Sequence, residues 1–170
     1  MATSHPTGGH VKRFELRLES HLPAAQAWAR ILNLRAHDRL IPFTHIVEGI
    51  ASADELRPGH RFVACTMIDG VRFRGRRLGF FDVMTIEEIS PPSADAPGHA
   101  RIVKSGKLIR GSVEVTVSPS RAGASTAAGA STILWAQEFG LARFPRVIGA
   151  IAQQVAPVAY RSMLKRLLRG

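Results

Sequence analysis

A single long amphipathic helix at the end of the chain is the strongest constraint on how this sequence can fold. The run from Arg143 to Arg169 reads RFPRVIGAIAQQVAPVAYRSMLKRLLR, and Pro145 suits the first position of a helix. Its apolar residues recur at three- and four-residue spacing: Val147, Ile148, Ile151, Val155, Val158 and Ala159. Most of the preceding sequence is typical of strands, and a long helix laid on a sheet buries both apolar faces.

The upstream pattern predicts one strand, two short helices and six further strands. Residues Val11 to Ser20 alternate apolar and charged side chains, as a half-buried strand does. The helices are predicted at Ala24–Leu32 and Leu34–Leu40. The later strands are predicted at Phe43–Ile50, His60–Ile68, Val71–Ile89, Ala100–Lys107, Leu108–Ser118 and Thr132–Phe139. Asp69-Gly70 indicates a tight hairpin turn between the strands on either side of it.

Length and composition favour one globular domain, at residues 11–170, after a disordered N-terminus at residues 1–10. The chain has 170 residues, of which 45% are hydrophobic, and no apolar run is long enough to span a membrane. The N-terminus carries no apolar signal core, and Cys65 is the only cysteine, so no disulfide can form within the chain. We therefore expect a cytoplasmic monomer or homodimer.

The net charge of +10 raises the question of nucleic-acid binding. The basic residues are mostly scattered, and two local clusters carry no interleaved aromatic residues and no nucleic-acid motif. These clusters are Arg72, Arg74, Arg76, Arg77 and Arg161, Lys165, Arg166, Arg169. A solvated basic surface explains them better than a nucleic-acid site. The seven histidines show no paired ligand spacing, so we expect no metal and no cofactor.

Several short motifs occur together in a characteristic order. They are Pro23-Ala24-Ala25-Gln26-Ala27-Trp28, Pro58-Gly59-His60-Arg61-Phe62, the run Met84 to Pro92 (MTIEEISPP), Gly106 with Gly111-Ser112, and Thr132 to Trp135. In this order the chain resembles the helix-grip fold of the START and birch-pollen-allergen superfamily (SRPBCC). Within it, the chain is most similar to the polyketide cyclase/dehydrase-like branch.

The resemblance implies an α+β fold in which a curved, seven-stranded antiparallel sheet wraps a long C-terminal helix around an internal cavity. It implies a polyketide cyclase-like protein that binds an apolar or aromatic small molecule and catalyses cyclisation or dehydration. The alternative is a non-catalytic lipid or quinone carrier of the START type, with a basic mouth that contacts anionic membranes. A third alternative is an interaction protein that uses the basic end of the helix. The fold does not select among them, nor does it name the ligand.

Asp82 is the candidate acid or base. It lies in the middle of an apolar strand, where alternation puts it on one face with Met84 and Ile86. If that face is the interior, burial raises the pKa of the carboxyl group. The alternative is a convex-face position paired with an arginine. Arg74 and Lys104 are candidate partners or anchors for an anionic ligand, although we expect both at the surface.

The last strand and the long helix supply the other predicted ligand-binding residues. Trp135 and Gln137 share one strand face, and a buried indole N–H needs an acceptor such as the Gln137 amide. The predicted ligand-binding set is Trp135, Gln137, Met84, Ile86, Val147, Ile151, Val155 and Val158.

Two further features bear on the cavity. His37 and Asp38 are adjacent on a short helix, so they face different directions and are expected to be structural rather than catalytic. Tyr160 falls on the opposite side of the long helix from Val147, which argues against a catalytic phenol. Beyond Pro157 the apolar stripe shifts, so we expect the first half of the helix to cover the cavity and the last turns to pack elsewhere.

Overall fold

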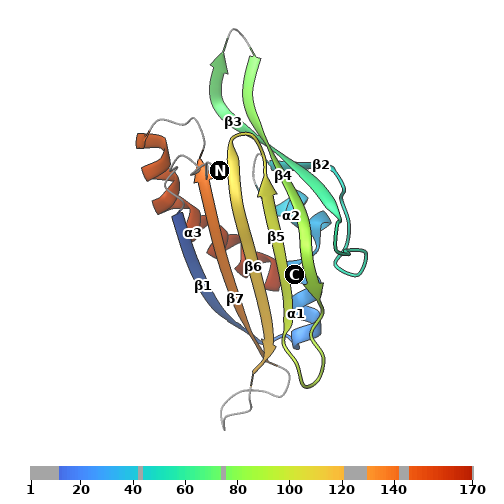
Figure 1. Ribbon diagram of the computed structural model, residues 1–170. Helices are drawn as coiled ribbons and strands as arrows, with labels where there is room; N and C mark the ends of the chain where they lie inside the picture. The colour runs from blue at the N-terminus through green and yellow to red at the C-terminus, as the bar shows by residue number, and fades with distance from the viewer. Residues whose placement is uncertain (1–11, 42–43, 74–75, 121–129, 142–145, 170) are drawn as a thin grey trace, which may run out of the picture.

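The computed structural model contains the elements in the predicted order (Figure 1). It describes residues 12–41, 44–73, 76–120, 130–141 and 146–169. The elements are β1 (Lys12–Ser20), α1 (Ala24–Ile31), α2 (Leu34–Leu40), β2 (Thr44–Glu48), β3 (Arg61–Phe73), β4 (Arg76–Ser90), β5 (Gly98–Ser105), β6 (Ile109–Pro119), β7 (Ser131–Leu141) and α3 (Arg146–Arg169). This confirms the predicted fold class, a helix-grip α+β fold with a seven-stranded sheet.

The sheet is antiparallel throughout, in the order β1-β7-β6-β5-β4-β3-β2. The first strand along the chain, β1, pairs with the last, β7, so these two strands lie side by side in the sheet. All three helices lie on one side of the sheet, and α3 contacts β1, α1 and α2 (Figure 1). The opposite face of the sheet carries charged side chains, including Arg17, Glu19 and Arg101.

Backbone irregularities bend the strands toward the helices. In β4, Ile86 pairs with Ile102 and Glu88 pairs with Arg101, which leaves Glu87 as an extra residue in a bulge. Glu87 and Glu88 are consecutive and both exposed, as a bulge allows. A second shift in register occurs in β2 between Ile46 and Glu48. Bulges of this kind bend a strand and increase its twist, which gives the sheet a concave face.

The core lies between that concave face and the helices. Its members from the strands alternate along each sequence, for example Val113, Val115 and Val117 in β6. The last turns of α3 contribute Met163, Leu164 and Leu167. Each such side chain stabilises the fold by about 1.5–3 kcal/mol through burial. The expectation that the last turns of α3 pack away from the cavity is therefore wrong, because they form part of the same core.

The predicted turn at Asp69-Gly70 is also wrong. Strand β3 continues through these residues, and Phe73 pairs with Arg76 at the start of β4. The register of β3 against β4 shifts between Met67 and Arg72, so the Asp-Gly pair is accommodated as an irregularity within the ribbon. The strand-forming residues beyond it prolong the pairing.

Some expectations concern residues outside the described part of the chain. These include the disordered N-terminus, residues 1–10, and the start of the last helix at Pro145. The single-domain prediction for residues 11–170 remains a prediction. Within the described residues, no helix is both long enough and apolar enough to cross a membrane.

Candidate functional site

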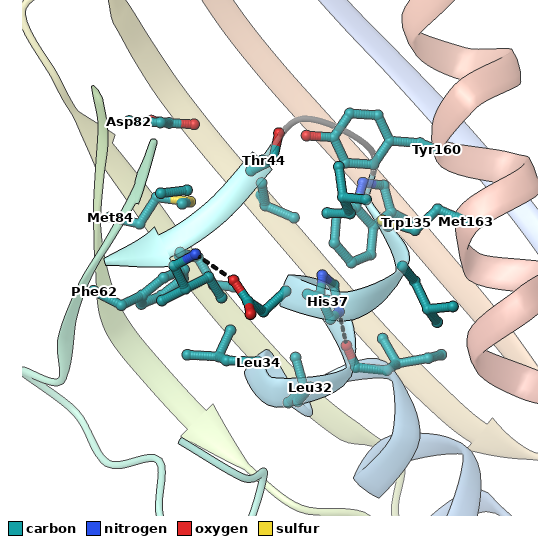
Figure 2. Close-up of a pocket in the computed structure, with 18 of the residues that line it drawn as sticks. Leu32, Leu34, His37, Thr44, Phe62, Asp82, Met84, Trp135, Tyr160 and Met163 are labelled. Carbon is teal, nitrogen blue, oxygen red and sulfur yellow. Dashed lines mark hydrogen bonds between the residues drawn. The ribbon is translucent and has the colours of Figure 1, made fainter. Parts of the chain in front are cut away.

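A cavity of about 390 Å³ lies between the concave face of the sheet and helices α2 and α3 (Figure 2). This volume falls within the roughly 300–1,000 Å³ of pockets that bind small organic molecules. Most of the wall is apolar, with side chains such as Phe62, Met84, Ile86, Ile102 and Trp135. The polar groups are few, and their placement determines what the cavity can bind.

A buried ion pair forms part of the sheet wall. Asp82 in β4 and Lys104 in the neighbouring β5 are 7% and 5% exposed, and the Lys104 ammonium donates to Asp82 Oδ2. Lys104 Nζ also lies 3.6 Å from the sulfur of Met84. The second carboxylate oxygen, Asp82 Oδ1, is buried and has no hydrogen-bond partner in the described structure. The wall therefore holds a charged pair with one unused acceptor.

The charge of Lys104 is maintained by its surroundings. Burial lowers the pKa of the ammonium group, but the negative charge of Tyr160 in its ionised form, the negative charge of Asp82 and the hydrogen bond to Asp82 favour the charged form and together outweigh burial. The pKa of Lys104 is therefore raised, and the group stays protonated at neutral pH. The expectation that Lys104 lies at the surface is wrong, because its position in β5 puts the side chain on the concave face.

Tyr160 projects from α3 into the cavity, and its hydroxyl group lies on the side where Asp82 is found (Figure 2). Gln137 Nε2 donates to the phenol oxygen at 3.4 Å, and Gln137 Oε1 accepts from the indole Nε1 of Trp135 at 3.3 Å. The Trp135 and Tyr160 rings lie 5.7 Å apart. This series of hydrogen bonds holds the phenol in place and leaves the hydroxyl proton of Tyr160 available for a ligand.

The predicted partner of the indole N–H is thus confirmed as Gln137. The amide itself is buried behind the wall, 4% exposed, and is not among the residues that line the cavity. It acts on the cavity through the Tyr160 hydroxyl.

Helix α2 contributes a second group of polar residues. His37 Nε2 lies 2.6 Å from the carbonyl oxygen of Ile31, and burial lowers the pKa of the imidazole. Asp38 Oδ1 accepts from the backbone N–H of Ile46 at 2.7 Å, which attaches β2 to α2. The two adjacent residues have separate partners, as predicted. Within the described residues, no group of three or more His, Cys, Asp or Glu residues is arranged to hold a metal ion.

The structure brings together part of the predicted ligand-binding set. Met84, Ile86 and Trp135 of that set line the cavity. Asp82, the candidate acid or base, lines it as well, which is the interior position that the alternation in β4 favoured. Val158 does not line it: this side chain is 70% exposed, because it lies on the solvent side of α3. The side chains of the other predicted helix residues, Val147, Ile151 and Val155, lie outside the described part of the structure.

Tyr160 is the residue that sequence reasoning missed. The helix was oriented by the apolar residues of its first half, which placed Tyr160 on the wrong side. A signal was nevertheless present, because Tyr160, Met163, Leu164 and Leu167 follow the i, i+3, i+4, i+7 spacing of one helix face. In the structure Met163 and Tyr160 line the cavity, and Leu164 and Leu167 are buried beside them.

Comparison with known proteins connects this geometry to a fold. No protein-family model matches the chain, and no characterised protein matches it by sequence. Among solved structures, Ara h 8.0201 is similar with a TM-score of 0.57 and 17% identity, covering 94% of this chain and 99% of that one.

Two enzymes are also similar in structure. A truncated norcoclaurine synthase from Thalictrum flavum has a TM-score of 0.55 and 11% identity, covering 97% of this chain and 98% of that one. The Zhui aromatase/cyclase from Streptomyces sp. R1128 has a TM-score of 0.52 and 12% identity, covering 94% and 95%. The chain therefore has the helix-grip fold of these three structures, as its sequence motifs indicated.

Proposed function

We propose that this protein binds an apolar or aromatic ketone in the cavity and catalyses proton transfer at the carbon next to the carbonyl group. Such a step is the chemical basis of polyketide-type cyclisation and dehydration. The observation that carries the proposal is the buried Asp82–Lys104 pair, with one carboxylate oxygen unpartnered, in an otherwise apolar wall. Burying two charges costs several kcal/mol per ion before their attraction is counted, so such a pair is a weak device for stability alone.

The three polar groups have complementary roles in this reaction. The Lys104 ammonium and the Tyr160 hydroxyl donate hydrogen bonds to the carbonyl oxygen and stabilise the negative charge that develops there in the enolate. The Asp82 carboxylate accepts the proton from the adjacent carbon. The apolar wall excludes water and holds the rest of the molecule in position.

Structural neighbours support this class of ligand. Norcoclaurine synthase from Thalictrum flavum, 12% identical with a TM-score of 0.52, has been solved in complex with dopamine and hydroxybenzaldehyde. The same fold in that enzyme therefore holds two aromatic molecules, one of them a carbonyl compound. The Zhui structure is described as an aromatase/cyclase.

The test is deuterium exchange into 2-tetralone, a bicyclic ketone with acidic protons beside its carbonyl group. The protein should accelerate exchange in D₂O, followed by NMR, and Asp82→Asn should reduce that acceleration by about 100-fold or more. Asp95→Asn, in an exposed loop, is the matched control and should retain the wild-type rate. Exchange no faster than in buffer, with 2-tetralone bound by calorimetry, would reject the catalytic proposal.

A carrier function is the second candidate, and one observation favours it. Arg166 lines the cavity and is exposed, and Arg161, Lys165 and Arg169 are exposed on the same last turns of α3. These cations suit contact with an anionic membrane during ligand loading. Co-sedimentation with phosphatidylserine vesicles that disappears at high salt, with no binding to phosphatidylcholine vesicles, would support a carrier. Absence of binding to either vesicle would exclude the membrane contact.

A further inference from the structure

We propose that His37 accepts a hydrogen bond from a hydroxyl group of the ligand, which makes the ligand a hydroxylated ketone rather than a plain hydrocarbon or a simple ketone. The ketone oxygen lies at Lys104 and Tyr160, and the hydroxyl group lies at His37. This inference rests on the proposed function, which supplies the ketone end, and adds a second recognition point on another wall of the cavity.

The first step is the fixed tautomer of the imidazole. Ile31 is the last residue of α1, so its carbonyl group belongs to the helix end that lacks intrahelical donors. His37 Nε2 lies 2.6 Å from that oxygen. A carbonyl oxygen only accepts, so Nε2 carries the proton, and in the neutral ring Nδ1 carries a lone pair.

The second step is the direction of that lone pair. Figure 2 shows one nitrogen of His37 joined to the Ile31 carbonyl and the other turned to the interior of the cavity. His37 is among the residues that line the cavity, and within the described residues Nδ1 has no hydrogen-bond partner. The imidazole therefore presents an unused acceptor to the ligand.

The third step is that the neighbouring polar groups on this side have hydrogen-bond partners of their own. Asp38 Oδ1 accepts from the N–H of Ile46 at 2.7 Å, and the hydroxyl groups of Thr44 and Thr66 bond one another at 2.9 Å. The surrounding wall includes Leu34 and Leu40, which offer the imidazole no donor. A hydroxyl group of the ligand supplies the donor that Nδ1 of His37 lacks. This matters because an unpaired acceptor in an apolar site is unfavourable once water is excluded.

A pair of matched ligands tests the inference. Calorimetry on the full-length protein compares 2-tetralone with its 6-hydroxy and 7-hydroxy derivatives, which keep the ketone and add a hydroxyl group at the far end. At least one hydroxylated ketone should bind about five- to tenfold more tightly than 2-tetralone, the ordinary contribution of one neutral hydrogen bond. His37→Phe keeps a ring of similar shape, and it should remove this preference while changing the affinity for 2-tetralone less than twofold.

The control is His99→Phe, on β5 outside the cavity, which should retain the preference. Equal affinity for all three ketones in the wild-type protein would overturn the role of His37 and leave the proposed function standing. Failure of all three to bind would overturn both.

A measurement on the wild-type protein covers the case in which His37→Phe does not fold. Nitrogen-15 NMR should find His37 protonated on Nε2, and only the Nδ1 resonance should move when the hydroxylated ketone is added. A shift of equal size with 2-tetralone, or a proton on Nδ1 in the free protein, would overturn the inference.

Discussion

Strands β4 and β5 carry ion pairs on both faces of the sheet, and the pairs on the two faces differ in how far they are exposed to water. On the concave face, Lys104 and Asp82 are buried in the cavity wall. On the convex face, Arg101 bonds Glu87 of β4 at 2.9 Å and Glu114 of β6 at 2.6 Å, with side chains 38–50% exposed. The convex pairs join neighbouring strands in water, while the concave pair is removed from it.

The comparison separates structural charges from functional ones. Exposed pairs gain little because water screens them, but they also lose little hydration, so they are ordinary features of a sheet surface. The concave pair loses most of its hydration and still leaves Asp82 Oδ1 without a partner. Burial therefore costs this pair more than it costs the convex pairs, and this is the reason for the proposed role of Asp82 and Lys104 in proton transfer.

Breaking the concave pair from one side should have the largest effect. Asp82→Leu leaves the Lys104 ammonium buried and unpaired, so the free energy of unfolding should fall by about 3–5 kcal/mol. Urea unfolding followed by circular dichroism measures this change. In the matched surface variant Glu87→Leu the free energy of unfolding should fall much less. Equal losses of stability in the two variants would contradict the distinction between the faces.

Replacing the whole concave pair should restore stability and abolish function. In Asp82→Leu/Lys104→Met no buried charge is left, so the free energy of unfolding should lie between the wild-type value and about 4 kcal/mol above it. The same protein should no longer accelerate exchange of 2-tetralone. A double variant that is stable and still active would show that the ion pair is not the catalytic device.

The half-buried imidazole of His37 supplies a smaller, pH-dependent effect. Burial lowers the folded-state pKa of His37, whereas the unfolded value is about 6.5. His37 therefore contributes full stability above about pH 6.5, and this is lost as pH falls from there toward the folded pKa, by at most about 1.4 kcal/mol per pH unit. Asp38, Arg166 and the Asp82–Lys104 pair are the charged groups that line the same cavity.

The measurement compares wild type with His37→Gln by urea unfolding at pH 7.0 and 5.5. The amide keeps a donor for the Ile31 carbonyl but does not titrate in this range, and the other titrating groups cancel in the comparison. Wild type should lose more stability than the variant between the two pH values, because only wild type carries the titrating imidazole. An equal loss would show that His37 is free to become charged in the fold.

The smallest effect is expected on the convex face. Arg101→Met removes both exposed ion pairs, and the urea midpoint should change little because these groups are screened by water. Adding salt should reduce the remaining difference in urea midpoint between wild type and Arg101→Met. A large loss of stability would mean that the convex pairs act as a network and that the contrast between the faces is one of degree.

The sequence predicted the architecture well, because alternation and helical spacing report directly on which side of an element is buried. The interior position of Asp82 followed from its alternation with Met84 and Ile86. Lys104 was only one of two candidate partners for Asp82, with Arg74, because the choice depends on the diagonal offset between two strands, and strand register is not encoded in local composition.

The misplacement of Tyr160 has a related cause. Helical phase was taken from the first half of α3, whereas the interior position of Tyr160 follows the phase of Met163, Leu164 and Leu167 in the second half. In the same way, the Asp69-Gly70 signal was local, while the continuing pairing of β3 with β4 is a property of both strands together.

The extra residue of the β4 bulge has a consequence for how such a cavity can change. Glu87 is exposed and touches no ligand-facing group, yet the bulge bends the strand from which Asp82, Met84 and Ile86 project. Deleting Glu87 would restore regular pairing with β5, keep Ile86 and Ile89 on the same face, and remove the bend. The depth of the cavity therefore depends on the number of residues in β4. An insertion or deletion at an exposed position can change the shape of the cavity without changing the residues that line it.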